Sequence, residues 1–261
     1  MKIKIISRKG GNLRFLLDNA TPAFANALRR VMLSEIPNLT IDIVDFEDNT
    51  SALFDEIIAH RLGMLPLQFD PKKFNFHDEC RCKGKGCSLC EVFFSLEKTG
   101  PAMVHSSDIK SSNRGVKPTS PDFPIVELLK NQHIKFEAIA RLGRGKNHAK
   151  FQSANVSYTY LPVIEVSQAK DLKRIVKSCP KGVLGIKNRK LVLLDPYKCD
   201  ECNICEEAGG GNVKIKSDPA KFVFSVESIS GLEPKYIVEE SSRILQEKAK
   251  EFKDQLRKVR G

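Results

Sequence analysis

The spacing of hydrophobic and polar positions changes several times along the chain, and each change predicts a new element. The first twenty residues alternate in two short segments, KIKII and LRFLLD, which predict two strands that turn at Gly10 and Gly11. Residues 22–36 follow a helical spacing, begin with a proline that favours the first turn, and end before Pro37. An alternating segment and a second short helix that ends at Gly63 come next.

The rest of the chain divides into a β-rich region and a final helix. Residues 91–165 alternate in four segments around a loop rich in proline and serine, and the alternation resumes near residue 222. A helix from Pro234 to about Val259 would reach about 38 Å, longer than a small domain covers, so we expect it to pack on a partner chain. We expect a fold of the α+β class. The apolar stripe of the last helix comprises Ile237, Ile244 or Leu245, Ala249, Phe252, Leu256 and Val259.

Length and charge narrow the classes of protein to consider. At 261 residues the chain has room for two or three small domains, and it has no run of about 18 apolar residues that would predict a membrane span. The N-terminal segment alternates and then turns, unlike a secretory signal peptide. Lysine and arginine total 43 against 32 aspartates and glutamates, and the net charge of +11 suits acidic partners, including nucleic acids.

Four cysteines toward the C-terminal end form the most specific chemical pattern. They are Cys179, directly before Pro180, and a C-x2-C-x2-C run of Cys199, Cys202 and Cys205. Bacterial-type ferredoxins hold one iron–sulfur cluster with such a run and a Cys-Pro from elsewhere in the sequence. Three thiolates on one tight loop can face three corners of a cluster, and the fold must bring the fourth. The pattern therefore predicts that these four cysteines bind an iron–sulfur cluster.

The positions of a second ferredoxin cluster are missing. A two-cluster ferredoxin would carry a cysteine where this chain has Gly209, and three more where it has Ala169, Leu172 and Ile175. Apolar residues in that stretch instead follow a helical spacing, which predicts a helix on a small core. The segment therefore resembles a ferredoxin with a single cluster, of the 4Fe-4S or the 3Fe-4S type.

A second cysteine group, formed by Cys80, Cys82, Cys87 and Cys90, lies in a loop rich in glycine and lysine. Four thiolates so close in sequence can close tetrahedrally around one Zn²⁺, which leaves no open position for catalysis. Disulfides, free thiols and another iron–sulfur cluster are the alternatives. Eight cysteines in two groups of four indicate metal ligands in a reducing, intracellular compartment.

The sequence offers no catalytic constellation. Its histidines are scattered, without the H-E-x-x-H spacing of zinc peptidases, and we interpret each as structural. The glycine stretch at 142–146 lacks the form of a phosphate-binding loop. The histidines are His60, His77, His105, His133 and His148.

Six blocks of sequence form a further pattern, and they are spread from the first predicted helix to the strand that precedes the final helix. They include NALRRVMLSEIP at 26–37, DEIIAHRLGMLPL at 55–67 and FVFSVES at 222–228, with shorter blocks at 49–51, 140–143 and 148–151. On these blocks the chain resembles the alpha-type assembly subunits of cellular RNA polymerases over essentially its whole length. It is most similar to the archaeal D-type form with a ferredoxin-like insert, related to bacterial alpha and to the third-largest subunit of eukaryotic polymerase II.

This resemblance implies a fold in three parts. Residues 1–41 and 220–261 would form a dimerisation domain, 42–165 a β-rich insert domain that contains the cysteine loop at 80–90, and 166–219 a ferredoxin-like domain. The first and last helices would pair with a smaller alpha-like subunit, called L in archaea. The insert domain would touch the large catalytic subunits and the small subunits N and P. The zinc loop of the family maps onto Cys80, Cys82, Cys87 and Cys90.

The resemblance also implies a role in transcription. Phosphodiester chemistry belongs to the large subunits of DNA-directed RNA polymerase, so this chain would be a cytoplasmic scaffold without an active site or a sequence-specific contact to DNA. A ferredoxin-like redox protein with one cluster is the main alternative, and it predicts a reversible electron couple. A stand-alone nucleic-acid-binding protein is the next, and it predicts salt-dependent binding without partners.

Overall fold

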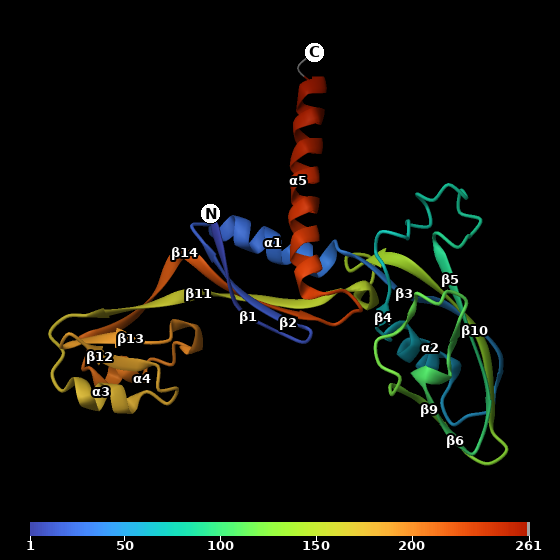
Figure 1. Cartoon of the computed structure of the whole chain (residues 1–261), viewed down its shortest axis with the longest axis horizontal. Helices are drawn as coiled ribbons and strands as arrows, with labels where there is room; N and C mark the ends of the chain where they lie inside the picture. The colour runs from blue at the N-terminus through green and yellow to red at the C-terminus, as the bar shows by residue number, and fades with distance from the viewer. Residues whose placement is uncertain (260–261) are drawn as a thin grey trace. The chain divides into compact units, whose positions relative to one another are not determined.

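The structure is a computed structural model that describes residues 1–259, and it confirms the α+β class (Figure 1). The described chain divides into two compact units, one of residues 1–9, 13–27 and 157–225, the other of residues 10–12, 28–156 and from 226 onward. The three-domain division stays a prediction. In chain order, with η for short 3-10 helices, the elements are β1 (Lys2–Lys9), β2 (Asn12–Asp18), α1 (Pro22–Ser34), β3 (Pro37–Asn49), α2 (Asp55–Gly63), β4 (Leu67–Gln68), β5 (Glu91–Thr99), β6 (Ala102–His105), η1 (Ser106–Asp108), β7 (Lys110–Ser111), β8 (Lys117–Pro118), β9 (Pro124–Leu128), β10 (His133–Arg144), η2 (Ala149–Phe151), β11 (Ala154–Val166), α3 (Leu172–Ser178), β12 (Leu184–Lys187), β13 (Lys190–Leu193), η3 (Pro196–Lys198), α4 (Ile204–Ala208), β14 (Val213–Ser228) and α5 (Pro234–Val259).

One four-stranded sheet joins segments that lie far apart in the sequence. Its strand order is β1-β2-β14-β11, so the predicted N-terminal hairpin pairs with strands that flank the cysteine-rich segment (Figure 1). Phe15 of β2 stacks on Phe224 of β14 with ring centroids 5.0 Å apart, and both rings are buried. The ring of Tyr158 of β11 packs on Phe224 at a tilt of 39°, with centroids 5.2 Å apart. Aromatic packing across three strands therefore forms the core of this sheet.

Two stretches of predicted strand differ from the sequence prediction. Strand β14 begins at Val213, well before the alternation near residue 222, because Pro219 interrupts the pattern without ending the strand. The second of the four alternating segments, residues 102–112, is not one strand, since η1 separates β6 from β7. The Asp108 carboxylate causes this turn: it accepts the His105 backbone N–H at 2.8 Å and pairs with Lys98 Nζ at 2.6 Å.

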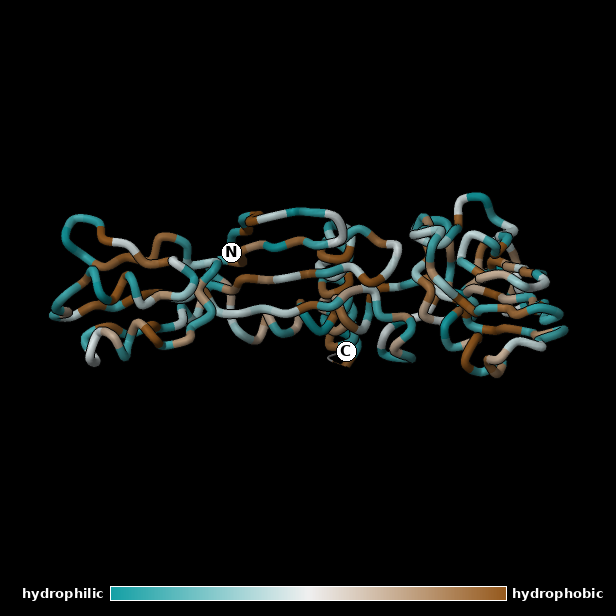
Figure 2. Tube along the Cα trace, turned by 90° about the horizontal axis from the view of Figure 1, so that it is seen from below, coloured by the Kyte–Doolittle hydropathy of each residue, from teal (hydrophilic) through white to brown (hydrophobic). Residues whose placement is uncertain are grey.

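A second four-stranded sheet, in the order β3-β10-β5-β7, forms the centre of the β-rich region. Strand β10 is antiparallel to both β3 and β5, and every second residue from Ile134 to Ala140 is buried. Helix α2 adds the buried side chains Ile58 and Leu62 to the same unit. Hydrophobic and hydrophilic positions alternate along the extended strands (Figure 2). The period-two pattern therefore predicted these strands correctly.

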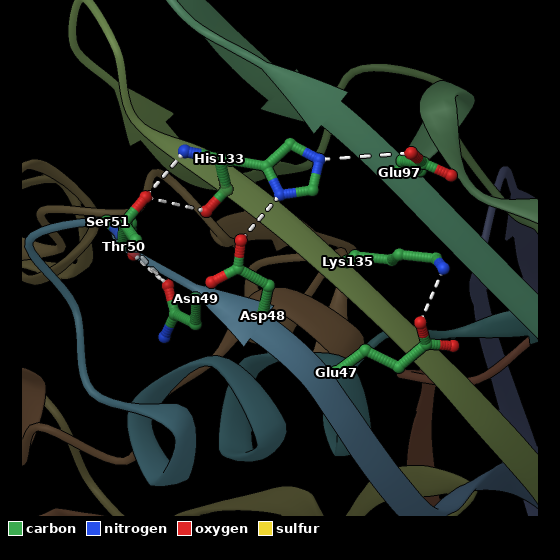
Figure 3. A network of polar contacts seen from close by, with 8 residues as sticks. All are labelled: Glu47, Asp48, Asn49, Thr50, Ser51, Glu97, His133 and Lys135. Atoms are coloured by element: carbon green, nitrogen blue, oxygen red, sulfur yellow. Dashed lines mark hydrogen bonds and ion pairs between the residues drawn. The ribbon is translucent and has the colours of Figure 1, made fainter.

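A network of hydrogen bonds and ion pairs connects the end of β3 to the start of β10 (Figure 3). The His133 backbone N–H donates to Thr50 Oγ1 at 2.7 Å, and its ring Nδ1 lies 2.9 Å from Asp48 Oδ2. Next to it, Lys135 pairs with Glu47 across the two strands. This histidine is held between strands by carboxylate and hydroxyl groups, which fits its interpretation as structural.

The cysteine-rich segment between β11 and β14 has a small core of its own. Ile175 of α3, as predicted for a helix there, is buried against Leu184, Leu191, Cys205 and Val213. The hairpin β12–β13 and helix α4 complete the segment, and neither was predicted. At its base, the Ser167 backbone N–H donates to the Asn212 carbonyl at 2.9 Å.

The last helix, α5, runs from Pro234 to Val259, as predicted. Only its first two turns bury side chains, including Ile237 and Ser241. Between residues 1 and 259, the chain contains no helix with the length and apolar character of a membrane span.

Candidate metal centres

The four C-terminal cysteines line a single pocket. Cys179, Cys199, Cys202 and Cys205 line one small pocket that is partly open to solvent. The remaining wall is largely apolar, with Val183, Leu184, Leu193 and Ile215. Four thiols around one apolar pocket are the donor set that an iron–sulfur cluster requires.

Each cysteine comes from a different local structure. Cys179 directly follows α3, Cys199 directly follows η3, and Cys205 lies in α4. Cys202 lies exposed in the loop between η3 and α4. The short elements therefore bring the distant Cys179 to the C-x2-C-x2-C run, as the sequence pattern requires.

The loop around Cys202 has an unusual backbone. Glu201 and Asn203, on either side of this cysteine, both have positive φ angles, of 53° and 62°. Left-handed conformations are unfavourable for a glutamate, and such strain is often found where a loop holds a ligand. Left-handed residues next to right-handed ones turn successive N–H groups into a concave surface that suits anions, including iron–sulfur centres.

The thiols of this pocket affect one another electrostatically. Burial raises the pKa of Cys205, and the neighbouring Cys199, Cys202 and Cys179 raise it further by charge repulsion. Burial also raises the pKa of Cys199. Bound iron would favour the thiolates, because a metal cation stabilises the deprotonated ligands around it. The residues present therefore fit the cluster that the sequence predicts.

The second cysteine group converges more tightly. The Sγ atoms of Cys80, Cys82, Cys87 and Cys90 all lie within 4.8 Å of one another. Sulfur–sulfur distances are 3.6 Å for Cys80–Cys87 and Cys82–Cys90, and 3.7 Å for Cys87–Cys90. Because Cys90 touches two thiols rather than one, the group forms one cluster instead of two separate pairs. All eight cysteines of the chain are free thiols. Four such sulfurs can bind one metal ion, and the set matches a structural Zn²⁺ site.

Tight turns create this arrangement. The Lys83 backbone N–H donates to the Cys80 carbonyl at 2.9 Å, and the Cys90 N–H donates to the Cys87 carbonyl at 2.9 Å. Gly84 and Gly86 have φ angles of +77° and +81°, which glycine adopts without strain. The loop sequence therefore supplies the turns as well as the ligands.

Two of these thiols, Cys82 and Cys90, differ strongly in acidity. Burial raises the pKa of Cys90 to about 12. Burial acts in the same direction on Cys82, but hydrogen bonds from Cys80, Cys90, Cys87 and the Gly84 N–H outweigh it and lower the pKa of Cys82 to about 7. Cys82 therefore ionises well before Cys90, and its thiolate can begin metal binding.

A buried carboxylate supports this loop, and the sequence analysis did not identify it. Glu91 follows the last cysteine, and its side chain is only 6% exposed. Its Oε1 accepts hydrogen bonds from the Arg141 guanidinium, at 2.8 Å from Nε, and lies 3.2 Å from His77 Nε2. A side chain on Gly86 would place its Cβ 2.1 Å from Glu91 Oε2, so the cysteine loop lies directly on this carboxylate. Glu91 thus connects the loop to strand β10.

Comparison with known proteins places the whole chain in one family. The family model described as "RNA polymerase Rpb3/RpoA insert domain" matches residues 41–164. The chain is 40% identical to DNA-directed RNA polymerase subunit Rpo3 of Thermoplasma volcanium over 248 residues, which cover 89% of this chain and 90% of that protein. It is 38% identical to the Rpo3 of Pyrococcus horikoshii, covering 100% of each chain, and 35% identical to that of Methanosarcina acetivorans, covering 97% of each. The chain belongs to the Rpo3 family of DNA-directed RNA polymerase subunits.

The range matched by the insert-domain model contains only one of the two cysteine groups. Residues 41–164 contain most of the sheet β3-β10-β5-β7 and the loop from Cys80 to Cys90. The four cysteines of the C-terminal group lie outside that range, in the segment between β11 and β14.

The far half of α5 is a third candidate site of this Rpo3-family chain. After Leu245 the apolar residues of the predicted stripe face solvent, with Phe252 65%, Leu256 49% and Val259 84% exposed. Just past the middle of the helix, Lys248 Nζ pairs with Glu35 Oε1 at 2.8 Å. An exposed apolar stripe on a well-formed helix is typical of a protein–protein contact.

Proposed function

We propose that this chain is a non-catalytic assembly subunit of DNA-directed RNA polymerase, of the archaeal D type. In this role it forms a heterodimer with the smaller alpha-like subunit L and supports the large catalytic subunits during transcription. The observation that carries the proposal is α5, a helix of 26 residues whose apolar stripe is exposed beyond Leu245. Membership of the Rpo3 family supports the same role.

The division of labour within the proposed complex follows the predicted domains. The dimerisation domain contributes α1 and α5 to the contact with subunit L. The insert domain contacts the large subunits and the small subunits N and P, and phosphodiester chemistry takes place in the large subunits. The proposed location is the cytoplasm.

We also propose that both cysteine groups hold metal. Cys179, Cys199, Cys202 and Cys205 would hold an iron–sulfur cluster of the 4Fe-4S or 3Fe-4S type, and the pocket that they line together supports this. Cys80, Cys82, Cys87 and Cys90 would hold Zn²⁺, supported by the convergence of their sulfur atoms. A bound metal would cross-link the four cysteines of its group. Metal ligation would thereby couple the folding of a small loop or core to the presence of the metal.

Co-expression with a small alpha-like subunit and the large polymerase subunits tests the assembly proposal. We expect Phe252→Ser combined with Leu256→Ser to abolish the stable heterodimer, because serine removes apolar area from the stripe. The matched control combines Gln246→Ser and Gln255→Ser, which change exposed polar positions of the same helix. Equal pull-down of the small subunit by both variants would contradict the assignment of α5 as the interface.

Anaerobic preparation with iron and sulfide analysis and electron paramagnetic resonance tests the cluster. We expect about four or three iron atoms per chain, depending on the cluster type. Cys202→Ser combined with Cys205→Ser should remove the cluster and lower both thermal stability and partner binding. If heterodimer formation and melting stay unchanged while the iron is lost, the cluster has no role in assembly.

A redox carrier with one cluster is the alternative function. The exposed position of Cys202 favours it, since this thiol would place one corner of a cluster near solvent. It predicts a reversible electron couple and an electron-transfer partner. Co-purification with the large polymerase subunits in place of such a partner decides for assembly.

A further inference from the structure

Seven exposed cations lie together in the cysteine-rich segment. They lie in α3, just before α3, and at the tip of the hairpin β12–β13. We refer to them as the α3–hairpin surface. Its members are Lys170, Lys173, Arg174, Lys177, Lys187, Arg189 and Lys190.

The two elements that carry these cations are in direct contact. Ile175 of α3 is buried in the same small core as Leu184 of β12 and Leu191 of β13. Near the tip, Arg189 and Lys190 line one pocket together with Leu172, the first residue of α3. The cations of the helix and of the hairpin therefore lie on two elements that pack against each other.

These cations lack acidic partners within the described residues, whereas other cations of the segment have them. Lys181 pairs with Asp200 at 3.8 Å, Lys198 with Asp195 at 3.2 Å, and Lys216 with Glu165 at 2.7 Å. None of the seven forms such a pair with a residue between 1 and 259. The acid nearest in sequence, Asp171, instead accepts the Arg174 backbone N–H at 3.2 Å as the cap of α3.

The cations of the hairpin occupy positions that are unfavourable for local stability. Lys187 lies directly opposite Lys190 in the strand register, and like charges in that position destabilise a hairpin. The turn residues Asn188 and Arg189 both have positive φ angles, of 50° and 59°. Such a turn favours glycine in its second position, where this chain has arginine. Local stability is therefore lower than a glycine turn with neutral neighbours would give, which is typical of a functional position.

We infer that the α3–hairpin surface binds the phosphate backbone of nucleic acid, without reading its sequence. Unpaired lysine and arginine side chains neutralise phosphates and release counterions, which gives sequence-independent affinity. An acidic protein is a poorer fit, since protein interfaces are depleted in lysine and have an apolar centre. Ile186 is the one large apolar residue between Leu184 and Lys190 that is substantially exposed, at 43%.

Binding of labelled nucleic acid to the anaerobically prepared full chain tests this inference. The test variant combines Lys187→Gln, Arg189→Gly and Lys190→Gln, which removes three charges and relieves both local conflicts, so the hairpin is expected to gain stability. The control combines Lys181→Gln, Lys198→Gln and Lys216→Gln, cations that have acidic partners in the same segment. Each variant lowers the net charge from +11 by the same three units. Equal iron content of the two variants shows that the segment remains folded.

We expect fluorescence anisotropy with duplex DNA and single-stranded RNA to give salt-dependent binding for the unmodified chain. The hairpin variant should bind about tenfold more weakly, and its slope of log affinity against log salt should fall by about 2–3, close to one unit for each lost phosphate contact. The control should stay within about twofold of the unmodified chain. Equal losses in both variants would overturn the inference, because net charge alone would then explain binding. Equally strong binding of poly-glutamate would also overturn it in favour of an acidic protein partner.

Discussion

Replacing Glu91 by glutamine tests whether the carboxylate beneath the cysteine loop helps to hold its metal. The residue follows Cys90 directly, and its buried Oε1 meets both the Arg141 guanidinium and His77 Nε2. Glutamine keeps the shape and one acceptor oxygen but removes the negative charge. Arg141 and His77 would then face a neutral group, and the loop that lies on this side chain at Gly86 would lose its fixed support.

The expected magnitude has two parts. Residues hydrogen-bonded to metal ligands typically contribute about 10–100-fold to metal affinity, or about 1.4–2.7 kcal/mol, and we expect the lower end for Glu91 because its partners are Arg141 and His77 rather than the cysteines. Loss of a hydrogen bond to a charged group lowers the free energy of unfolding by about 1.5–3 kcal/mol. We expect the lower end of that range, because the Arg141 side chain is 25% exposed and water can partly replace the carboxylate.

Zinc competition with a chromophoric chelator measures the first part, and denaturant unfolding of the zinc-free chain measures the second. Glu97→Gln is the control, since this glutamate lies on the same strand with a side chain 66% exposed. The reasoning is refuted if Glu91→Gln binds zinc as tightly as the unmodified chain while its unfolding free energy falls. In that case Glu91 would stabilise the sheet without positioning the loop.

Three further predictions concern the sheets and the thiols. Phe224→Ala should lower the unfolding free energy by about 3–5 kcal/mol in denaturant titrations, because it removes a fully buried ring stacked on Phe15; a loss under about 1 kcal/mol would contradict this core. For Glu35, burial raises its pKa, but hydrogen bonds from Lys248 and Lys146 outweigh burial and lower it. The Glu35 ion pairs therefore stabilise the fold fully above the unfolded pKa of about 4.3, and this stabilisation is lost as the pH falls through the lowered pKa of the folded state. Glu35→Gln should lower the free energy of unfolding by less than about 1 kcal/mol at neutral pH and should not change it in strong acid. Because burial raises the pKa of Cys90 to about 12, zinc binding must release protons, and chelator competition should show affinity rising from about pH 6 to about pH 8; a flat profile would exclude thiolate ligation.

The hydrophobic periodicity and the glycine and proline positions predicted most of the regular elements from sequence alone. The turn at Gly10 and Gly11, the helix that begins at Pro22 and the final helix all have local signals, and each was confirmed. The hairpin β12–β13 was missed because its turn is Asn188-Arg189, which lacks the glycine that usually marks such a turn. Its strands are also only four residues each, too short for a clear period.

The candidate sites were predictable to the extent that their signals are local. Cysteine spacing alone indicated eight ligand candidates, and the fold gathers each group of four in one place. Glu91 could not be found in this way, because its partner Arg141 lies fifty residues further along the chain. An acidic residue directly after the last cysteine of a loop is common on a solvated surface, and only the strand pairing of β5 with β10 brings Glu91 to Arg141. The residue that supports the cysteine loop therefore depends on strand pairing between distant parts of the chain, which the local sequence does not show.

The contact between Ser167 and Asn212 has a consequence for how this chain could have diversified. These residues hold together the two ends of the cysteine-rich segment, by the backbone bond and by a second one from Ser167 Oγ at 3.2 Å. An insertion with joined ends and its own small core can be gained, lost or exchanged without changing the register of the strands on either side. We expect a chain with a short turn in place of residues 168–211 to keep its β1-β2-β14-β11 sheet. The cysteine-rich segment would then be an evolutionary addition to the scaffold, open to change at a different rate from the sheet that carries it.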